Sequence, residues 1–128
     1  MNVLLDTNAL LWFLNDAPEL SRQARTVIED EQNVCLTSMA TGWEMAIKVT
    51  LGKLQTPIPL RYLFTEELER LHFTMLPIEA RHLHQLLTLP LHHRDPFDRM
   101  LIAQALSEGL AVVGSDAAFD AYGVQRIW

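Results

Sequence analysis

The sequence predicts an α/β fold in three layers, α/β/α, with a central, mainly parallel sheet of four to five strands. Short apolar runs alternate with longer segments of helical periodicity, and capping residues open several of those segments. This alternation is typical of a parallel sheet that helices cover on both faces. A length of 128 residues, 49% of them hydrophobic, is ordinary for one globular domain, which we expect over residues 1–128.

The chain begins with an apolar run, Asn2–Leu5, that is expected to form a buried strand. The turn Asp6-Thr-Asn8 follows with good capping residues and leads into an apolar stretch that reaches Leu14. Ser21 is suited to cap a helix that ends near Glu31, because the apolar residues between them recur on one helical face.

The middle of the chain repeats this order of strand and helix. Val34–Thr37 reads as a second strand, and Ser38 caps a helix that ends at Gly52. Two prolines then mark a linker into a helix near Leu60–Leu71, and Phe73–Leu76 forms a third strand.

Two helices separate the third strand from the fourth. The first is predicted over Glu79–Leu87, with four residues on its inner side: Ala80, Leu83, Leu86 and Leu87. The second begins at Asp95-Pro96, an N-cap followed by proline at the first helical position, and ends at Ser107 before a glycine.

The last segment completes the predicted sheet. Leu110–Val113 forms a fourth strand, Asp116–Ala121 a short helix and Val124–Ile127 a final strand. No repeat, low-complexity segment or domain boundary interrupts the order, so the sequence predicts one three-layer domain.

The net charge and the single cysteine limit the kinds of binding surface and the cellular compartment that the sequence predicts. A net charge of −6 argues against a broad nucleic-acid-binding surface, although eight of the ten basic residues are arginine, which suits phosphate recognition. Cys35 lies in an apolar run, so no disulfide framework is expected. With no basic leader and no apolar stretch of about 18–20 residues, a cytoplasmic protein is predicted.

Four acidic residues lie where functional groups collect in a parallel sheet, outside the carboxyl ends of the strands. Asp6 directly follows the first strand, and Asp116 follows the fourth after a glycine that allows a tight exit. Asp98 is in the first turn of the helix that begins at Asp95-Pro96, and Glu44 is two turns into the helix after the second strand. We expect the four to converge at one end of the sheet.

Asp6 is the most informative of these acids. An ionisable group beside the core is costly unless another charge compensates it, and no lysine or arginine is near it in the sequence. Oxygen ligands select hard cations such as Mg²⁺ or Mn²⁺, and such an ion can activate water and stabilise an in-line displacement at phosphorus. Without the ion, carboxylates ~4 Å apart repel strongly enough for one or more to take up a proton.

Each of the other acids also has a simpler interpretation. Asp116 is placed to cap the short helix that follows it, Asp98 to interact with a helix dipole, and Glu44 to pair with Lys48 one turn later. Asp95 is interpreted first as an N-cap, with membership of the acidic site as the alternative.

Three motifs occur in order along almost the whole chain. They are Leu4-Leu-Asp-Thr-Asn8, then Trp43-Glu-Met-Ala-Ile-Lys48 with Leu51-Gly-Lys-Leu54, then His93-Arg-Asp-Pro-Phe-Asp-Arg99 followed by Ile102-Ala-Gln104. Together they resemble the PIN-domain nucleases and, within them, the VapC-type toxins of bacterial toxin–antitoxin pairs. The resemblance implies a PIN-like fold and an endoribonuclease activity that depends on Mg²⁺ or Mn²⁺.

The resemblance also assigns roles to individual residues. Asp6, Glu44 and Asp98 match the family's metal-binding acids, and Asp116 matches a last acid that holds the metal less directly in many members. Thr7 and Asn8 match polar residues that steady Asp6. The chain departs from the pattern at Thr41-Gly42, where similar sequences usually carry a serine and an apolar residue. A glycine inside a helix costs up to ~1 kcal/mol.

Residues beside the acids are open to two interpretations. Arg99 directly follows Asp98 and is suited either to contact a substrate phosphate or to pair with an acid. The basic patch His92-His-Arg94 reads either as a phosphate contact or as a solvated loop. Trp43 and Phe97 are interpreted as core residues, and any of the aromatic residues that is exposed is suited to stack on RNA bases.

Other functions remain open at this point. A phosphohydrolase would use Asp6 as a nucleophile, but haloacid-dehalogenase-like phosphatases place a second aspartate where this chain has Asn8. A receiver domain needs paired acids near the first strand and a lysine late in the chain. This chain has neither, because its only lysines are Lys48 and Lys53. A non-catalytic PIN-like scaffold is the third alternative.

Partners follow from the resemblance alone. Similar toxins form homodimers, cleave RNA and are blocked by a small antitoxin protein that inserts a segment near the acidic pocket. Apolar residues of Pro57–Leu71 are expected to serve such contacts if they are exposed.

Overall fold

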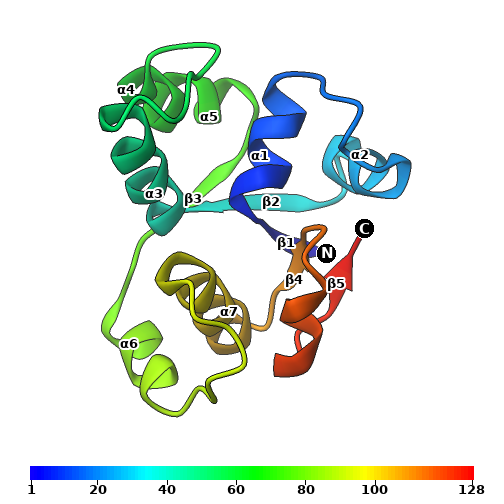
Figure 1. Ribbon diagram of the computed structural model, residues 1–128. Coiled ribbons are helices and arrows are strands. Elements are labelled where there is room, and N and C mark those ends of the chain that lie inside the picture. Colours follow the sequence, from blue (N-terminus) through cyan, green and yellow to red (C-terminus); the bar gives the residue numbers. More distant parts are fainter.

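The computed structural model describes residues 1–128 as a five-stranded parallel sheet with helices on both faces (Figure 1). The strand order is β3-β2-β1-β4-β5, and every neighbouring pair is parallel. The strands are β1 (Asn2–Leu5), β2 (Val34–Ser38), β3 (Thr74–Leu76), β4 (Ala111–Val113) and β5 (Arg126–Ile127). The predicted three-layer α/β/α class and the parallel sheet are therefore confirmed.

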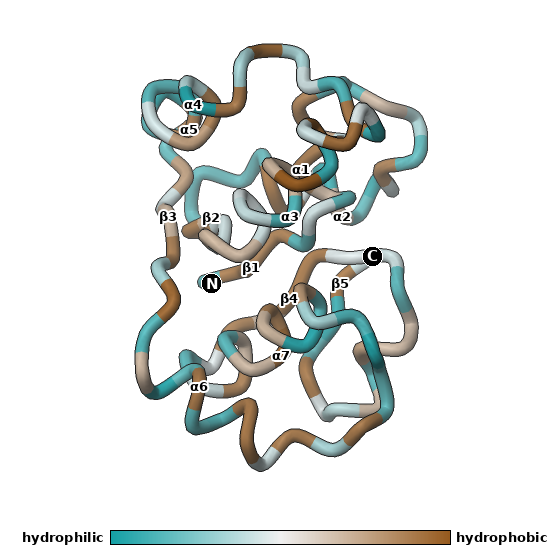
Figure 2. Tube along the Cα trace, turned by 60° about the vertical axis from the view of Figure 1, so that its left-hand side comes forward, coloured by the Kyte–Doolittle hydropathy of each residue, from teal (hydrophilic) through white to brown (hydrophobic).

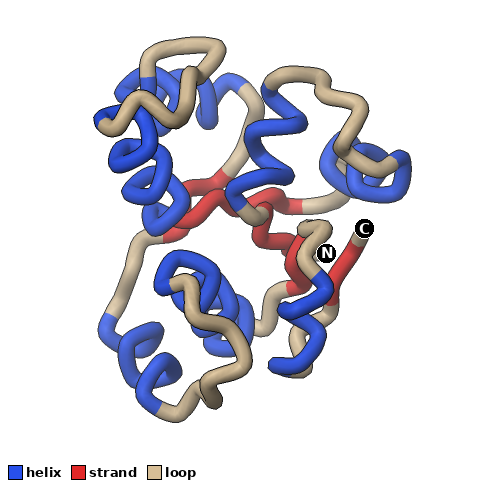
Figure 3. The backbone as a smooth tube through the Cα atoms, in the orientation of Figure 1, coloured by secondary structure: helices blue, strands red, loops and turns tan.

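Helices connect the strands and lie above and below them (Figure 3). The helices are α1 (Thr7–Leu14), α2 (Arg22–Glu29), α3 (Met39–Thr50), α4 (Leu60–Tyr62), the π-helical turn η1 (Leu63–Glu67), α5 (Leu68–Arg70), α6 (Ala80–Leu87), α7 (Pro96–Glu108) and the 3₁₀ helix η2 (Ala117–Tyr122). None of them is both long enough and apolar enough to span a lipid bilayer.

The strand order creates a crevice at the site predicted for the acids. The chain leaves β1 towards β2 and β3 on one side and later returns to place β4 and β5 on the other. Loops that leave neighbouring strands in opposite directions leave a crevice outside the carboxyl ends of those strands, where ligands bind in open α/β sheets. Here the crevice lies between β1 and β4, which lead directly to Asp6 and to the segment that holds Asp116.

Two apolar layers hold the helices to the sheet. On one face Val3 and Leu5 of β1 pack with α1, α2 and α3, and on the other face Leu4 packs with α7 and η2. The strands β1 and β4 are coloured as hydrophobic in Figure 2, as expected for strands buried on both faces. Cys35 belongs to the first layer, where burial raises the pKa of its thiol to about 11.

The predicted helix caps are present and fix where the site-bearing helices begin. The Ser38 hydroxyl oxygen accepts a hydrogen bond from the Ala40 N–H at the start of α3 and donates to Gln104 Oε1 of α7. Asp95 caps α7 by accepting from the N–H groups of Phe97 and Asp98. Each cap satisfies backbone donors that the helix itself leaves free.

The helix predicted over Leu60–Leu71 is a helical segment with a π turn in its middle, which the sequence pattern did not indicate. Phe64, in that turn, packs against Gly42 of α3, where a Cβ atom would lie 3.1 Å from the Phe64 ring. Glycine at position 42 therefore lets the Phe64 ring approach α3 closely, which accounts for the departure noted at Thr41-Gly42.

The inner face predicted for α6 is wrong. Leu87 is 84% exposed and Leu83 is also exposed, whereas His82 is fully buried. The His82 ring accepts a hydrogen bond from the Glu79 N–H and contacts Glu108 Oε1 of α7 at 2.8 Å. A buried polar side chain is tolerated when its hydrogen bonds are made, and here those bonds fasten α6 to α7.

Candidate active site

Asp6 lies in the crevice directly after β1. Its backbone N–H continues the sheet by donating to the Val113 carbonyl at 3.0 Å, and its side chain caps α1 by accepting from the Ala9 N–H at 2.7 Å. The side chain is almost fully buried, with 6% of the residue exposed. The carboxylate is thus fixed between a strand end and a helix start.

Gly114 makes room for this carboxylate. A Cβ atom at position 114 would lie 2.9 Å from Asp6 Cγ and closer still to its Oδ2 atom. Because the other carboxylate oxygen is bonded to Ala9, the side chain of Asp6 cannot turn away without losing that bond. Any side chain at position 114 would displace Asp6.

Replacing Gly114 with alanine is therefore expected to weaken divalent-ion binding about 10–100-fold, the usual cost of disturbing the residues that support a metal ligand. Calorimetric titration with Mn²⁺ measures the change. Ser115→Ala, one residue away and exposed, serves as the control and is expected to bind as the wild type does. Equal affinities of Gly114→Ala and the wild type would show that Asp6 does not need this space.

Glu44 faces the same crevice from α3. The Thr7 hydroxyl donates to Glu44 Oε1 at 2.7 Å, and the Lys48 ammonium lies 3.0 Å from Oε2. The Thr41 hydroxyl is 3.2 Å from that of Thr7. Thr7 therefore steadies Glu44, whereas the family resemblance had implied that it steadies Asp6.

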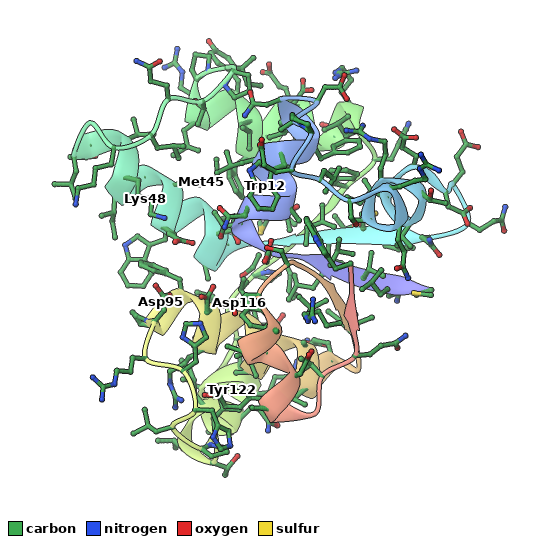
Figure 4. The ribbon with its side chains drawn as sticks, turned by 45° about the vertical axis from the view of Figure 1, so that its right-hand side comes forward. Trp12, Met45, Lys48, Asp95, Asp116 and Tyr122 are labelled. Carbon is green, nitrogen blue, oxygen red and sulfur yellow. The ribbon has the colours of Figure 1, made fainter.

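Asp98 and Asp116 approach the crevice from the opposite side, from the first turn of α7 and from the cap of η2. His93 joins them, because its Nε2 atom lies 3.1 Å from Asp98 Oδ2 and 3.1 Å from Asp116 Oδ2. Ligand atoms of these three residues all lie within 4.8 Å of one another. Figure 4 shows Asp95 and Asp116 on the side that faces α3 and Lys48.

The charges of the four acids act on one another. Burial raises the pKa of Asp6 to about 7; the hydrogen bond from Ala9 opposes this rise, and the charges of Asp98, Asp116 and Glu44 add to it. Burial is also the main cause that raises the pKa of Asp98 to about 6, followed by the charge of Asp95. The neighbouring His93 acts in the opposite direction.

These residues fit a divalent cation. Asp6, Asp98 and Asp116 form no salt bridge with a lysine or arginine; the His93 ring contacts Asp98 and Asp116, and the charge of Arg126 acts on Asp116 from farther away. Carboxylate oxygens are the ligands that Mg²⁺ and Mn²⁺ prefer, and a cation in the crevice would remove the repulsion that raises the pKa of Asp6 and Asp98. Asp6, Glu44, Asp98 and Asp116 would hold it.

Two of the residues expected to support the site, Arg99 and Asn8, make no side-chain hydrogen bond with its acids. Arg99 donates to the backbone carbonyls of Pro90 and Leu89 at 2.9 and 3.3 Å, and it pairs with no acid. Its side chain holds the loop before α7 in place, because the guanidinium reaches back over that loop instead of into the crevice. Asn8 lies exposed in the first turn of α1, and its side chain makes no hydrogen bond within the chain.

The sequence did not indicate how His93 and Gly114 contact the acids. His93 was predicted only as part of a basic patch, either as a phosphate contact or as a solvated loop; the structure places it beside the cap of α7, where its Nδ1 accepts from the Asp95 N–H. Gly114 was interpreted only as a tight exit from the fourth strand. Neither contact, with Asp116 or with Asp6, follows from spacing along the chain.

An apolar groove of about 350 Å³ borders the acids. Trp43 and Phe97 form one wall, with ring centroids 5.1 Å apart in an edge-to-face arrangement, and each directly precedes an acid of the site. Trp43 is 61% exposed, so its interpretation as a core residue is wrong. A larger hollow of about 530 Å³, near Cys35, lies at the amino ends of the strands and takes no part in the site.

Comparisons with known proteins agree with this architecture. The chain is 30% identical over 66 residues to ribonuclease VapC16 of Mycobacterium tuberculosis, and the matched stretch spans about half of each protein, 52% of this chain and 47% of the relative. It superposes with a TM-score of 0.70 on VapBC2 from Rickettsia felis bound to a promoter DNA fragment, at 14% identity and with 98% and 97% of the two chains covered. VapC20 of M. tuberculosis, a toxin that cleaves the sarcin–ricin loop, gives a TM-score of 0.65 at 17% identity, with 95% of each chain covered.

The two superpositions extend the likeness in fold over nearly the whole chain. The family model described as PIN domain matches residues 3–125, which include all four acids and both strands that border the crevice. The chain therefore belongs to the PIN domain family.

Proposed function

We propose that this protein is a metal-dependent endoribonuclease, the toxin of a toxin–antitoxin pair, and that residues 1–128 act as one nuclease domain in the cytoplasm. The observation that carries the proposal is the convergence of Asp6, Glu44, Asp98 and Asp116 on one crevice of a PIN domain, with the pKa of Asp6 and Asp98 raised. The similarity to a ribonuclease, VapC16, supports RNA as the substrate.

The four acids would bind Mg²⁺ or Mn²⁺. A bound ion supplies Lewis-acid stabilisation of the phosphate charge and lowers the pKa of an attacking water. The protein's contribution is a fixed set of oxygen atoms. Asp6 is held by Ala9, while the hydroxyl of Thr7 and the ammonium of Lys48 hold the two oxygens of Glu44.

The raised pKa values of Asp6 and Asp98 also determine at which pH these carboxylates are ionised and able to bind a cation. Near neutral pH Asp6 of the metal-free site is partly protonated, and Asp98 takes up a proton as the pH falls through about 6, because burial and mutual repulsion disfavour the charged forms. A cation releases those protons when it binds. The site is thus arranged to accept positive charge, and it is unsuited to an RNA phosphate until that charge is present.

The exposed face of α3 supports the proposal that the toxin is a homodimer. Met39, Trp43 and Ile47 follow one another at intervals of four residues and are all exposed, and Leu51 continues the stripe. Exposed apolar surfaces of this kind are typical of protein partners. In Pro57–Leu71, the segment considered for antitoxin contacts, Tyr62 is exposed, while Leu63 and Leu68 are buried in the core.

We assign the apolar groove that Trp43 and Phe97 line to a segment of a cognate antitoxin. The groove is largely hydrophobic, and two of its lining residues, Trp43 and Phe97, directly precede Glu44 and Asp98, so a segment seated there would lie next to residues that carry the site. Solved complexes of similar fold, such as VapBC2 of R. felis, contain a VapB partner and support this assignment.

The proposed function is tested by mapping new RNA ends in cells after brief expression of the wild type and of Asp6→Asn. We expect the wild type to produce recurrent cleavage ends, because its four acids are intact, and the variant to produce none. The recurrent ends also identify the RNA and the cleaved sequence. Identical maps from the two proteins would overturn the assignment of nuclease activity to this site.

A further inference from the structure

His93 lies between two of the acids, Asp98 and Asp116. Its Nε2 atom is equidistant, at 3.1 Å, from Oδ2 of Asp98 and Oδ2 of Asp116. The ring packs edge-to-face against Phe119, with the two centroids 6.2 Å apart. The imidazole therefore bridges two side chains that would otherwise repel each other.

The loop that carries His93 is built to hold this position. The Tyr122 hydroxyl accepts hydrogen bonds from the N–H groups of both His92 and His93, at 2.9 and 2.6 Å. Arg99 donates to the carbonyls of Leu89 and Pro90 in the same loop. The position of the ring is thus set by contacts from α7 and η2.

One further contact decides which ring nitrogen carries a proton. The Asp95 N–H donates to Nδ1 of His93 at 3.2 Å, so Nδ1 must offer its lone pair. The hydrogen of the ring then resides on Nε2, where it points at Asp98 and Asp116. A protonated nitrogen has no lone pair for a metal, so His93 cannot act as a ligand through Nε2 in this arrangement.

A cation bound to the carboxylates would replace the Nε2–H of His93 as the positive group between Asp98 and Asp116. The oxygens of Asp98 and Asp116 would then turn to the cation, and the Nε2–H would need another acceptor. A phosphodiester group of the RNA substrate would provide this acceptor, because its two non-bridging oxygens share a negative charge. Hydrogen bonds to ionised acceptors are short and strong.

We propose that His93 is a substrate-binding residue that donates its Nε2–H to a phosphate oxygen of the RNA, and that it bridges Asp98 and Asp116 only while no ion is bound. This inference rests on the proposed function, since it assigns the group that His93 serves in RNA cleavage. It also excludes His93 from the ligands of the ion.

Two substitutions separate the donor from the rest of the side chain. His93→Asn retains an oxygen near the position of Nδ1 that accepts from Asp95 but lacks a donor at the distance of Nε2, and His93→Gln restores a donor at that distance. We expect kcat/KM for RNA cleavage to fall about 100-fold in His93→Asn and to recover at least about tenfold in His93→Gln. His84→Ala, which removes an exposed histidine of α6 away from the acids, is expected to cleave as the wild type does.

Direct ion binding provides a readout that does not depend on activity. His93→Asn is expected to bind Mn²⁺ up to about tenfold more tightly than the wild type, because the wild type must first give up the contacts of its Nε2–H with Asp98 and Asp116. The electron spin resonance of Mn²⁺ on the wild type should show no coupling to a directly bound nitrogen. Thermal unfolding of each variant confirms that it is folded.

The outcomes distinguish this inference from the proposed function. Nitrogen coupling in the wild type, or weaker Mn²⁺ binding in His93→Asn, would make His93 a metal ligand and overturn the inference. Unchanged cleavage by folded His93→Asn would also overturn it and leave the ribonuclease assignment intact. A wild type that neither binds Mn²⁺ nor cleaves RNA would overturn both.

Discussion

Replacing Asp6 with asparagine is expected to lower RNA cleavage by at least about 10³-fold while the fold is kept. Asparagine retains an oxygen that accepts from the Ala9 N–H, so the start of α1 is preserved. It removes the negative charge that a cation needs at the most buried acid of the site. The measurement is a cleavage rate on RNA with Mn²⁺ or Mg²⁺ under single-turnover conditions.

The same substitution is expected to stabilise the metal-free protein near neutral pH, because a buried charge that repels three neighbours is removed. Loss of activity would then coincide with a gain of stability, which a damaged fold cannot produce. Asp30→Asn, a matched change at an exposed position, is expected to alter neither property. Full metal-dependent cleavage by Asp6→Asn, purified free of other nucleases, would contradict the assignment of Asp6.

The metal-free protein is expected to lose stability as the pH rises from about 4 to 8. The folded state raises the pKa of Asp6 from 3.8 to about 7 and that of Asp98 to about 6, so between these values it binds more protons than the unfolded state does. Stability is then fully present below the unfolded pKa and is lost as the pH rises through the folded pKa. A shift of about three units at Asp6 corresponds to about 4 kcal/mol of unfolding free energy.

Denaturant unfolding in the presence of a chelator, repeated across this pH range, measures the effect. Mn²⁺ or Mg²⁺ should restore the lost stability at pH 8, by about 2.7 kcal/mol when the ion is at 100 times its dissociation constant. Asp6→Asn should flatten the pH profile of the metal-free protein. A wild-type profile that does not fall between about pH 4 and 8 would show that Asp6 is not held in its charged form against burial and repulsion.

The arrangement of elements was predictable because it depends on local signals. Alternating strands and helices identify the parallel sheet, and Ser38 and Asp95 mark where α3 and α7 begin. Asp6 stood out as an acid at the end of a buried strand for the same reason. Such features are set by neighbours along the chain, so a single sequence contains them.

Contacts between distant segments were not predictable from that sequence. The periodicity of α6 was interpreted from its leucines, but buried hydrogen bonds to Glu79 and Glu108 place His82 inside instead. Thr7 was assigned to Asp6 beside it, whereas its hydroxyl contacts Glu44 on another helix. In both cases the position of a polar side chain depends on a partner far along the chain, Glu108 for His82 and Glu44 for Thr7. The pattern of hydrophobic residues does not indicate such partners.

The pairing of β1 with β4 determines how much of the chain must be synthesised before the proposed active site can form. Val3 pairs with Ala111, so the two sides of the crevice meet only after the residues up to Ala111 have left the ribosome. A nascent chain that already contains Asp6 and Glu44 still lacks Asp98 and Asp116. The topology thereby delays assembly of the four acids until β4 has been synthesised, and under the proposed function a product that ends before Asp98 would not cleave RNA.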